Sequence, residues 1–293
     1  MSQPTPALVT QRGAERLPRV ALFLFCAAYV LPGLFGRDPW RNADLTAFGY
    51  MAAMADGRTS WLAPTLGGLP AETALLPHWL GAAAIRALSP LLDPALAARL
   101  PFALLLVLAL ALIWYSTFNL ARTEAAQPVP FAFGGEAQPV DYARALADGA
   151  LLASIATLGL LQLGHETTPE LMQLSEVSLL LWALSAAPYR PRASTLAAWV
   201  ALLALATSGA PGIGVALGVL GTVICWRSGY ADVRGLAPWL ALATLLAAGL
   251  ATALSAWHWR VDPPAQAADW WALGRLLLWF TWPVWPLALW TVW

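Results

Sequence analysis

The stretch LPFALLLVLALALIWYSTFNL, residues 100–120, decides the fold class of this chain. It contains no charged residue, and an apolar run of about 20 residues can cross the roughly 30 Å hydrocarbon core of a membrane as one α-helix. Further apolar runs lie on both sides of it along the sequence. We therefore expect an all-α, polytopic transmembrane helical bundle.

The other apolar runs set the expected number of spans. The run at 195–226 is too long for one span, and its centre, Ser208-Gly209-Ala210-Pro211-Gly212, is typical of a turn, so we divide it into a hairpin of two short helices. This gives about eight spans, the last of them incomplete at residue 293. The remaining runs lie near 20–35, 147–164, 171–187, 236–256 and 276–293.

The composition excludes two classes of protein. Apolar residues make up 59% of the chain and charged residues 11%, against about 25% charged in soluble domains. The 16 basic residues, all of them arginine, are balanced by 16 acidic ones, so there is no basic surplus for nucleic-acid binding. Cys26 and Cys225 both lie in apolar runs, which indicates neither a disulfide framework nor a metal-ligand spacing.

Arginine predicts which side of the membrane each loop faces. Arg12, Arg16 and Arg19 precede the first apolar run and place residues 1–19 in the cytoplasm as a tail; residues 20–293 form the transmembrane domain. A cleaved signal peptide is the alternative interpretation of the first run.

The segment Pro77 to Leu92 is apolar but has only sixteen residues, and charge decides its placement. If it crossed the membrane, six arginines of later loops would move to the external side, so we expect an interfacial helix instead. The chain then has a long first external loop, 36–99, bearing interfacial helices, and a cytoplasmic loop, 121–147.

With this orientation most acids face the external side, and three of them are candidate functional residues. Asp44 begins a segment with apolar residues at helical spacing (Leu45, Phe48, Met51, Ala52, Ala55), so one interpretation makes it the cap of a surface helix. Glu166 and Glu170 are four residues apart, where one helical face could direct both inward. Solvated loop charge is the structural alternative, whereas carboxylates at a membrane edge are costly enough to indicate function.

Five sequence fragments occur in an order that resembles a known family. They are PWRNADLTAFG at 39–49, the pair GRTSWLAP at 57–64 and GGLPAETA at 67–74, HWL at 78–80, RLP at 99–101 and ATSGAP at 206–211. The set is similar to the polytopic glycosyltransferases of the GT-C fold, especially the protein mannosyltransferase and aminoarabinose transferase relatives. The likeness covers most of residues 20–230.

The resemblance implies a glycosyltransferase of a bacterial-type inner (plasma) membrane that takes a sugar from a polyprenyl-phosphate donor on the periplasmic face. Its acceptor would be a lipid, glycan or protein. The catalytic carboxylates would be Asp44 and Glu170, with Glu166 as the competitor of Glu170. Arg58 and Arg99 would bind the donor phosphate, because arginine pairs with phosphate in a bidentate way.

The aminoarabinose branch also implies a divalent metal, for which Glu72 and His258 are the corresponding ligands; an interfacial histidine is the alternative for His258. Two lysines of the family pattern are replaced here by Thr73 and Ser208. A non-catalytic relative that binds polyprenyl phosphate or assists a membrane partner is therefore the second hypothesis. A transporter, with the hairpin at 208–212 as a broken helix, ranks last.

Overall fold

A computed structural model describes residues 8–15, 17–71, 74–257, 266–280, 286 and 289. Across these residues the chain is mostly helical, and the only sheet found in this part is a hairpin of β1 (Thr65–Leu66) and β2 (Leu69–Pro70). The expected all-α class is confirmed.

The helices differ widely in length and in the length of the segments that connect them. In chain order they are η1 (Gln11–Ala14), α1 (Arg19–Val30), α2 (Asn42–Ala55), α3 (Leu75–Leu88), α4 (Pro94–Ala121), η2 (Glu124–Ala126), α5 (Pro139–Ile155), α6 (Leu158–Leu163), α7 (Pro169–Ala186), α8 (Pro191–Thr207), α9 (Pro211–Arg227), α10 (Ala231–Ala253) and α11 (Ala267–Phe280).

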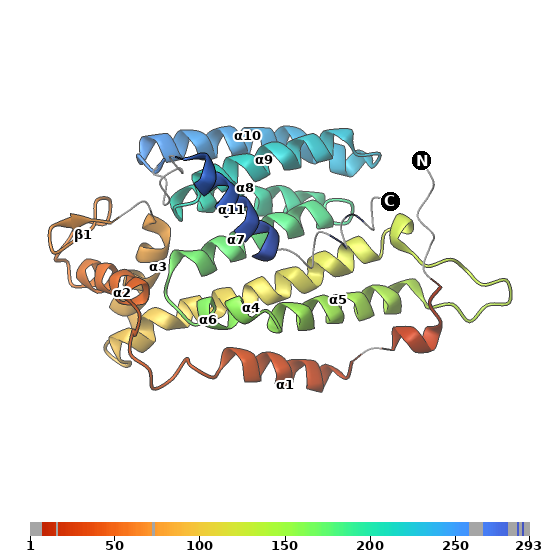
Figure 1. Cartoon of the computed structure of the whole chain (residues 1–293), viewed down its shortest axis with the longest axis horizontal. Coiled ribbons are helices and arrows are strands. Elements are labelled where there is room, and N and C mark those ends of the chain that lie inside the picture. The colour runs from red at the N-terminus through yellow and green to blue at the C-terminus, as the bar shows by residue number, and fades with distance from the viewer. Residues whose placement is uncertain are drawn as a thin grey trace.

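The long helices α4, α5, α7, α8, α9 and α10 lie lengthwise in one bundle (Figure 1). Helices α2 and α3 and the β-hairpin gather at one end of this bundle, which we call the α2 end. The opposite end holds η1 and the loop between α4 and α5. Helix α1 runs along the edge of the bundle beside α4 and α5.

Helix α4 shows how the local sequence determines where a helix begins. Asp93 is its N-cap and its Oδ2 accepts hydrogen bonds from the backbone N–H groups of Ala95 and Leu96. Pro94 occupies the first turn, where a missing N–H costs nothing. The helix therefore begins six residues before the apolar stretch at 100–120 and ends one residue after it.

The hairpin expected at 208–212 is confirmed. Helix α8 ends at Thr207, and α9 begins at Pro211. Gly209 between them has a φ of 87°, which an L side chain rarely adopts, and Pro211 sits in the first turn of α9.

Small residues let the helices of this region approach closely. Ala183, Ala198, Ala243 and Ala247 are buried between α7, α8 and α10. A Cβ added at Gly218 of α9 would lie 2.1 Å from Thr244 Oγ1 of α10. Membrane helices associate through such small residues because the lipid supplies no hydrophobic drive between them.

Two expected boundaries are wrong. The helix expected at 147–164 begins at Pro139 and ends at Ile155, and α6 follows as a separate short helix. The loop expected at 121–147 is correspondingly shorter. Asp148, within the expected run, is buried, and its Oδ1 accepts a hydrogen bond from Trp114 Nε1 at 2.8 Å.

Two of the described helices, α4 and α10, are long and apolar enough to cross a membrane. The expected number of about eight spans is not confirmed, since α8 and α9 are apolar but have 17 residues each and α1 has 12. Helix α3 has 14 residues, about 21 Å, which is shorter than the hydrocarbon core, and its interfacial placement stays a prediction. The last expected run begins within α11 and mostly lies outside the described residues.

Candidate functional site

Asp44 lies at the centre of a buried polar cluster at the α2 end of the bundle. Its side chain is 0% exposed although it sits in the first turn of α2. The backbone N–H and the hydroxyl of Thr167 both donate to Asp44 Oδ1, each at 2.8 Å. The loop before α7 is thereby joined to the first loop of the chain.

Two arginines accompany this carboxylate. Arg37 Nη2 lies 3.9 Å from Asp44 Oδ2 and donates to the backbone oxygen of His165 at 2.7 Å. Arg99, buried in the second turn of α4, donates through Nη1 to the backbone oxygen of Arg37. The cluster therefore combines one carboxylate and two guanidiniums: Arg37 and Asp44 are seven residues apart, and Arg99 comes from a distant helix.

Several polar atoms of this cluster have no hydrogen-bond partner among the described residues. They are Asp44 Oδ2, Arg37 Nε, and Nε and Nη2 of Arg99. Buried polar atoms are nearly always hydrogen-bonded, and leaving one unsatisfied costs about 1–3 kcal/mol. The arrangement has unused donor capacity for an anion and an acceptor for a hydroxyl group.

The expectation that Asp44 caps its helix is wrong. Arg41 is the N-cap residue of α2, and the Asp44 carboxylate points to Thr167 instead of to its own backbone. The apolar stripe is also displaced: Met51 is fully buried, but Leu45 is 48% exposed. A tertiary contact has replaced the local cap, and the buried face of α2 is turned to include Asp44.

Glu166 and Glu170 do not share a helical face. Glu166 lies in the loop between α6 and α7, is buried, and accepts a hydrogen bond from Gln162 Nε2 at 3.3 Å. Glu170 is half-buried in the first turn of α7. The single continuous helix that would have aligned them is interrupted by Pro169, where α7 begins.

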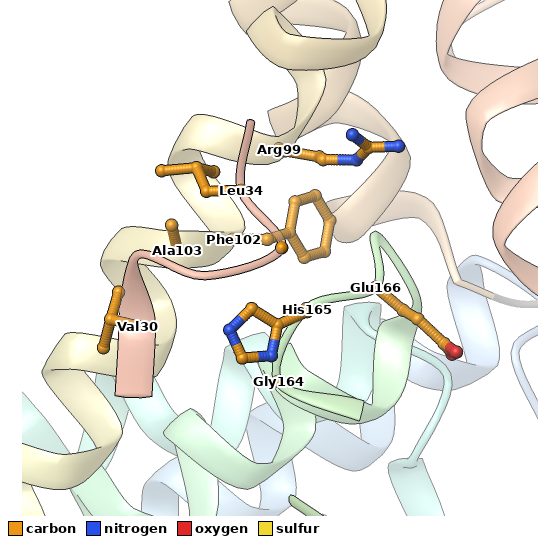
Figure 2. A pocket seen from close by; sticks show the side chains of 9 residues that line it. Val30, Leu34, Arg99, Phe102, Ala103, Gly164, His165 and Glu166 are labelled. Carbon is orange, nitrogen blue, oxygen red and sulfur yellow. The ribbon is translucent and has the colours of Figure 1, made fainter. Parts of the chain in front are cut away.

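A small cavity opens beside the cluster, lined by Arg99, Phe102, His165 and Glu166 among others (Figure 2). Its volume is about 10 Å³, which is the space of about one water molecule. In Figure 2 the His165 and Glu166 side chains leave the same loop in different directions. His165 Nε2 lies 3.0 Å from the backbone oxygen of Tyr29 and so ties this loop to the end of α1.

The other site candidates lie apart from this cluster or outside the described residues. Arg58 is exposed and forms a 2.8 Å ion pair with Asp56 just after α2. Glu72 and His258, the candidate metal ligands, lie outside the described residues. Within the part of the chain that is described, no group of three or more His, Cys, Asp or Glu residues could hold a metal ion.

Sequence reasoning missed Arg37, Thr167 and Glu176. Arg37 carried a signal, since it is a cation directly after the first apolar run, on the side expected to be poor in arginine. Glu176 was the carboxylate inside the run at 171–187; it is buried and its Oε2 accepts a hydrogen bond from Ser208 Oγ at 2.7 Å. Thr167 carried no signal, because its role depends on a contact 123 residues away.

No protein-family model, curated protein or solved structure matches this chain.

Proposed function

We propose that this protein is an integral-membrane glycosyltransferase that uses a polyprenyl-phosphate sugar as donor. The observation that carries the proposal is the buried cluster of Asp44, Arg37 and Arg99, which unites a carboxylate with two guanidiniums that have unused donors. The ordered sequence fragments that resemble GT-C glycosyltransferases include both Asp44 and Arg99.

Contacts between loops support the grouping of loops by side that the proposal needs, and the arginine distribution supplies the orientation. The first loop, through Arg37 and Asp44, contacts residues 165–167, so two loops expected on the external side lie together. At the other end Gln11 N–H donates to the backbone oxygen of Gly135, and two segments expected in the cytoplasm lie together. The proposed site then faces the periplasm.

The proposed chemistry assigns one role to each charge. The bond between the sugar C1 and the donor phosphate oxygen breaks, and a bond forms between C1 and the acceptor oxygen. Asp44 accepts the proton of the acceptor hydroxyl, as a positioned carboxylate does in general-base catalysis. Arg99, with Arg37, stabilises the negative charge left on the polyprenyl phosphate through charge-assisted hydrogen bonds.

Substrates require the site to open, because a cavity of about 10 Å³ excludes a sugar. The segment between α1 and α2 covers the cluster and contains Gly33 and Gly36, both at positive φ. We expect this segment to move when the donor binds, since conformational closure over a site is a common way to exclude water from a reaction.

The test is the substitution Asp44→Asn, which removes the base but keeps the shape of the side chain. Membrane vesicles that supply the acceptor are given a panel of undecaprenyl-phosphate hexoses and aminopentoses, and release of undecaprenyl phosphate is measured. We expect the wild type to release it from one donor of the panel and Asp44→Asn to lose at least about 100-fold, in line with the usual contribution of general-base catalysis. The matched control is Asp232→Asn, an exposed acid at the start of α10.

Arg99→Lys separates loss of function from loss of folding. It keeps the charge but not the bidentate geometry, so we expect a raised KM for the lipid donor in a protein that remains monodisperse. Wild-type activity in Asp44→Asn, or no release from any donor by the wild type, would contradict the proposal.

The small volume of the cavity and the neutral residues Thr73 and Ser208 favour a second candidate, a non-catalytic relative. That protein would retain undecaprenyl phosphate during purification without releasing it from any sugar donor. Binding without turnover in the same vesicles would select this candidate over the enzyme.

A further inference from the structure

A large groove lies away from the Asp44 cluster, between α1, α4 and α5. Its volume is about 630 Å³, within the range of small-molecule sites. Most of the lining is apolar, and Leu22, Cys26, Leu110 and Ala111 are part of it. Helix α1, which runs along the edge of the bundle (Figure 1), contributes Arg19, Leu22 and Cys26 to the lining.

The length of the groove matches one leaflet of a membrane. Along α4 its lining extends from Val107 to Phe118, which corresponds to a rise of about 16 Å. The hydrocarbon core of a bilayer is about 30 Å thick, so the groove covers about half of it. It begins near the middle of α4 and ends near the cytoplasmic end assigned to that helix.

Two arginines line the groove at its cytoplasmic end. Arg19 begins α1 and Arg144 lies in the second turn of α5, and both line the groove. Neither has a hydrogen-bond or ion-pair partner in the described part of the chain. The one acid of the lining, Asp148, accepts a hydrogen bond from Trp114 Nε1 and keeps its negative charge, but the two arginines outnumber it and the lining remains net positive.

We propose that this groove binds an anionic phospholipid of the cytoplasmic leaflet. The acyl chain lies along α1 and α4, and the headgroup phosphate lies between Arg19 and Arg144. Charge complementarity selects an anionic over a zwitterionic lipid, because an arginine near the membrane surface attracts anionic headgroups. The bound lipid fills the groove between α1 and the pair α4 and α5. This inference does not depend on the glycosyltransferase proposal.

Native mass spectrometry of the purified full chain tests the proposal. Micelles carry either phosphatidylglycerol or phosphatidylethanolamine, and the fraction of protein with one bound lipid is measured. We expect the wild type to retain phosphatidylglycerol preferentially, and the double variant Arg19→Gln/Arg144→Gln to lose that preference by about tenfold. The matched control, Arg227→Gln/Arg234→Gln, removes the arginine that ends α9 and the one in the first turn of α10, neither of which lines the groove, and should keep the preference.

Two further measurements separate the contributions of chain and headgroup. Ala111→Trp fills the groove and should lower the retention of both lipids in a protein that remains monodisperse. Soluble glycerol phosphate should not compete with phosphatidylglycerol. An equal loss in the control variant, unchanged retention in Ala111→Trp, or competition by glycerol phosphate would each overturn the proposal.

Discussion

Asp44 is a buried carboxylate whose charge is balanced by contacts from another part of the chain. Thr167 supplies two hydrogen bonds to Oδ1, and Arg37 lies 3.9 Å from Oδ2. Removing one partner of a buried charge is more damaging than removing a surface ion pair, because the remaining charge stays in a poorly solvated position. The stability of this end of the molecule is therefore sensitive to a single hydroxyl group.

Thr167→Val tests this sensitivity at nearly constant side-chain volume. The substitution removes the hydroxyl donor but keeps the backbone N–H bond to Asp44. We expect the free energy of unfolding to fall by about 1.5–3 kcal/mol, the usual contribution of a hydrogen bond to a charged group. Denaturant titration in detergent micelles measures it.

Thr195→Val is the control for that prediction, because the Thr195 hydroxyl bonds only the backbone oxygen of Pro191 in its own helix. A loss in Thr195→Val as large as that in Thr167→Val would show that the Asp44 contact contributes nothing specific.

At the scale of elements, the backbones of α9 and α10 come close together at Gly218. Gly218 faces Thr244, and Thr244 Oγ1 itself donates to the backbone oxygen of Leu240. A methyl group at position 218 would lie within 3.0 Å of the Cβ and Cγ2 of Thr244 as well as 2.1 Å from its oxygen. The two helices would have to separate to admit it.

Gly218→Ala should therefore destabilise the bundle by about 1–3 kcal/mol, the usual cost of overpacking, despite the better helix propensity of alanine. Gly212→Ala is the matched control, since an added Cβ there meets nothing within 4 Å. Thermal unfolding in detergent compares the two. The double variant Gly218→Ala/Thr244→Ala should recover part of the loss, and no recovery would mean that this pair does not set the helix separation.

The elements that depend on local signals were predictable, and those that depend on distant contacts were not. Helix α4 and the turn at Gly209 follow from apolar length, proline and glycine. The start of α5 was misplaced because the apolar run begins only at Ala147, whereas the helix begins eight residues earlier and includes the charged residues Asp141 and Arg144. The candidate site divides in the same way: Asp44 and Arg99 stood out by sequence, whereas Arg37 and Thr167 join them only through tertiary contacts.

At the scale of the whole molecule, the two ends of the bundle carry different sets of loops. The α2 end joins the first loop to residues 165–167, and the opposite end joins residues 9–11 to residues 135–137. Arg122 also lies at that opposite end, 3.3 Å from the ring centroid of Tyr189, in the loops expected in the cytoplasm. The loops pair in the combinations that the arginine distribution predicts.

Cysteine labelling measures this sidedness directly. In a background with Cys26→Ala and Cys225→Ala, a single cysteine replaces Leu91 or Phe133, whose side chains are 85% and 103% exposed. We expect a membrane-impermeant maleimide to label Leu91→Cys in intact cells and Phe133→Cys only after permeabilisation. The opposite pattern would invert the topology and move the Asp44 cluster to the cytoplasmic side.

The contact between Asp44 and Thr167 also limits how early the first loop can fold during synthesis. The two residues are 123 positions apart, and a ribosome adds about 5–20 residues per second, so Asp44 emerges roughly 6–25 s before its partner. During that interval the two hydrogen bonds from Thr167 are missing, and Arg37 is the ion-pair partner already made. The first loop therefore reaches its final position late, after α4 and α5 have been made, and a nascent chain released before residue 167 exposes an acid that the finished protein conceals.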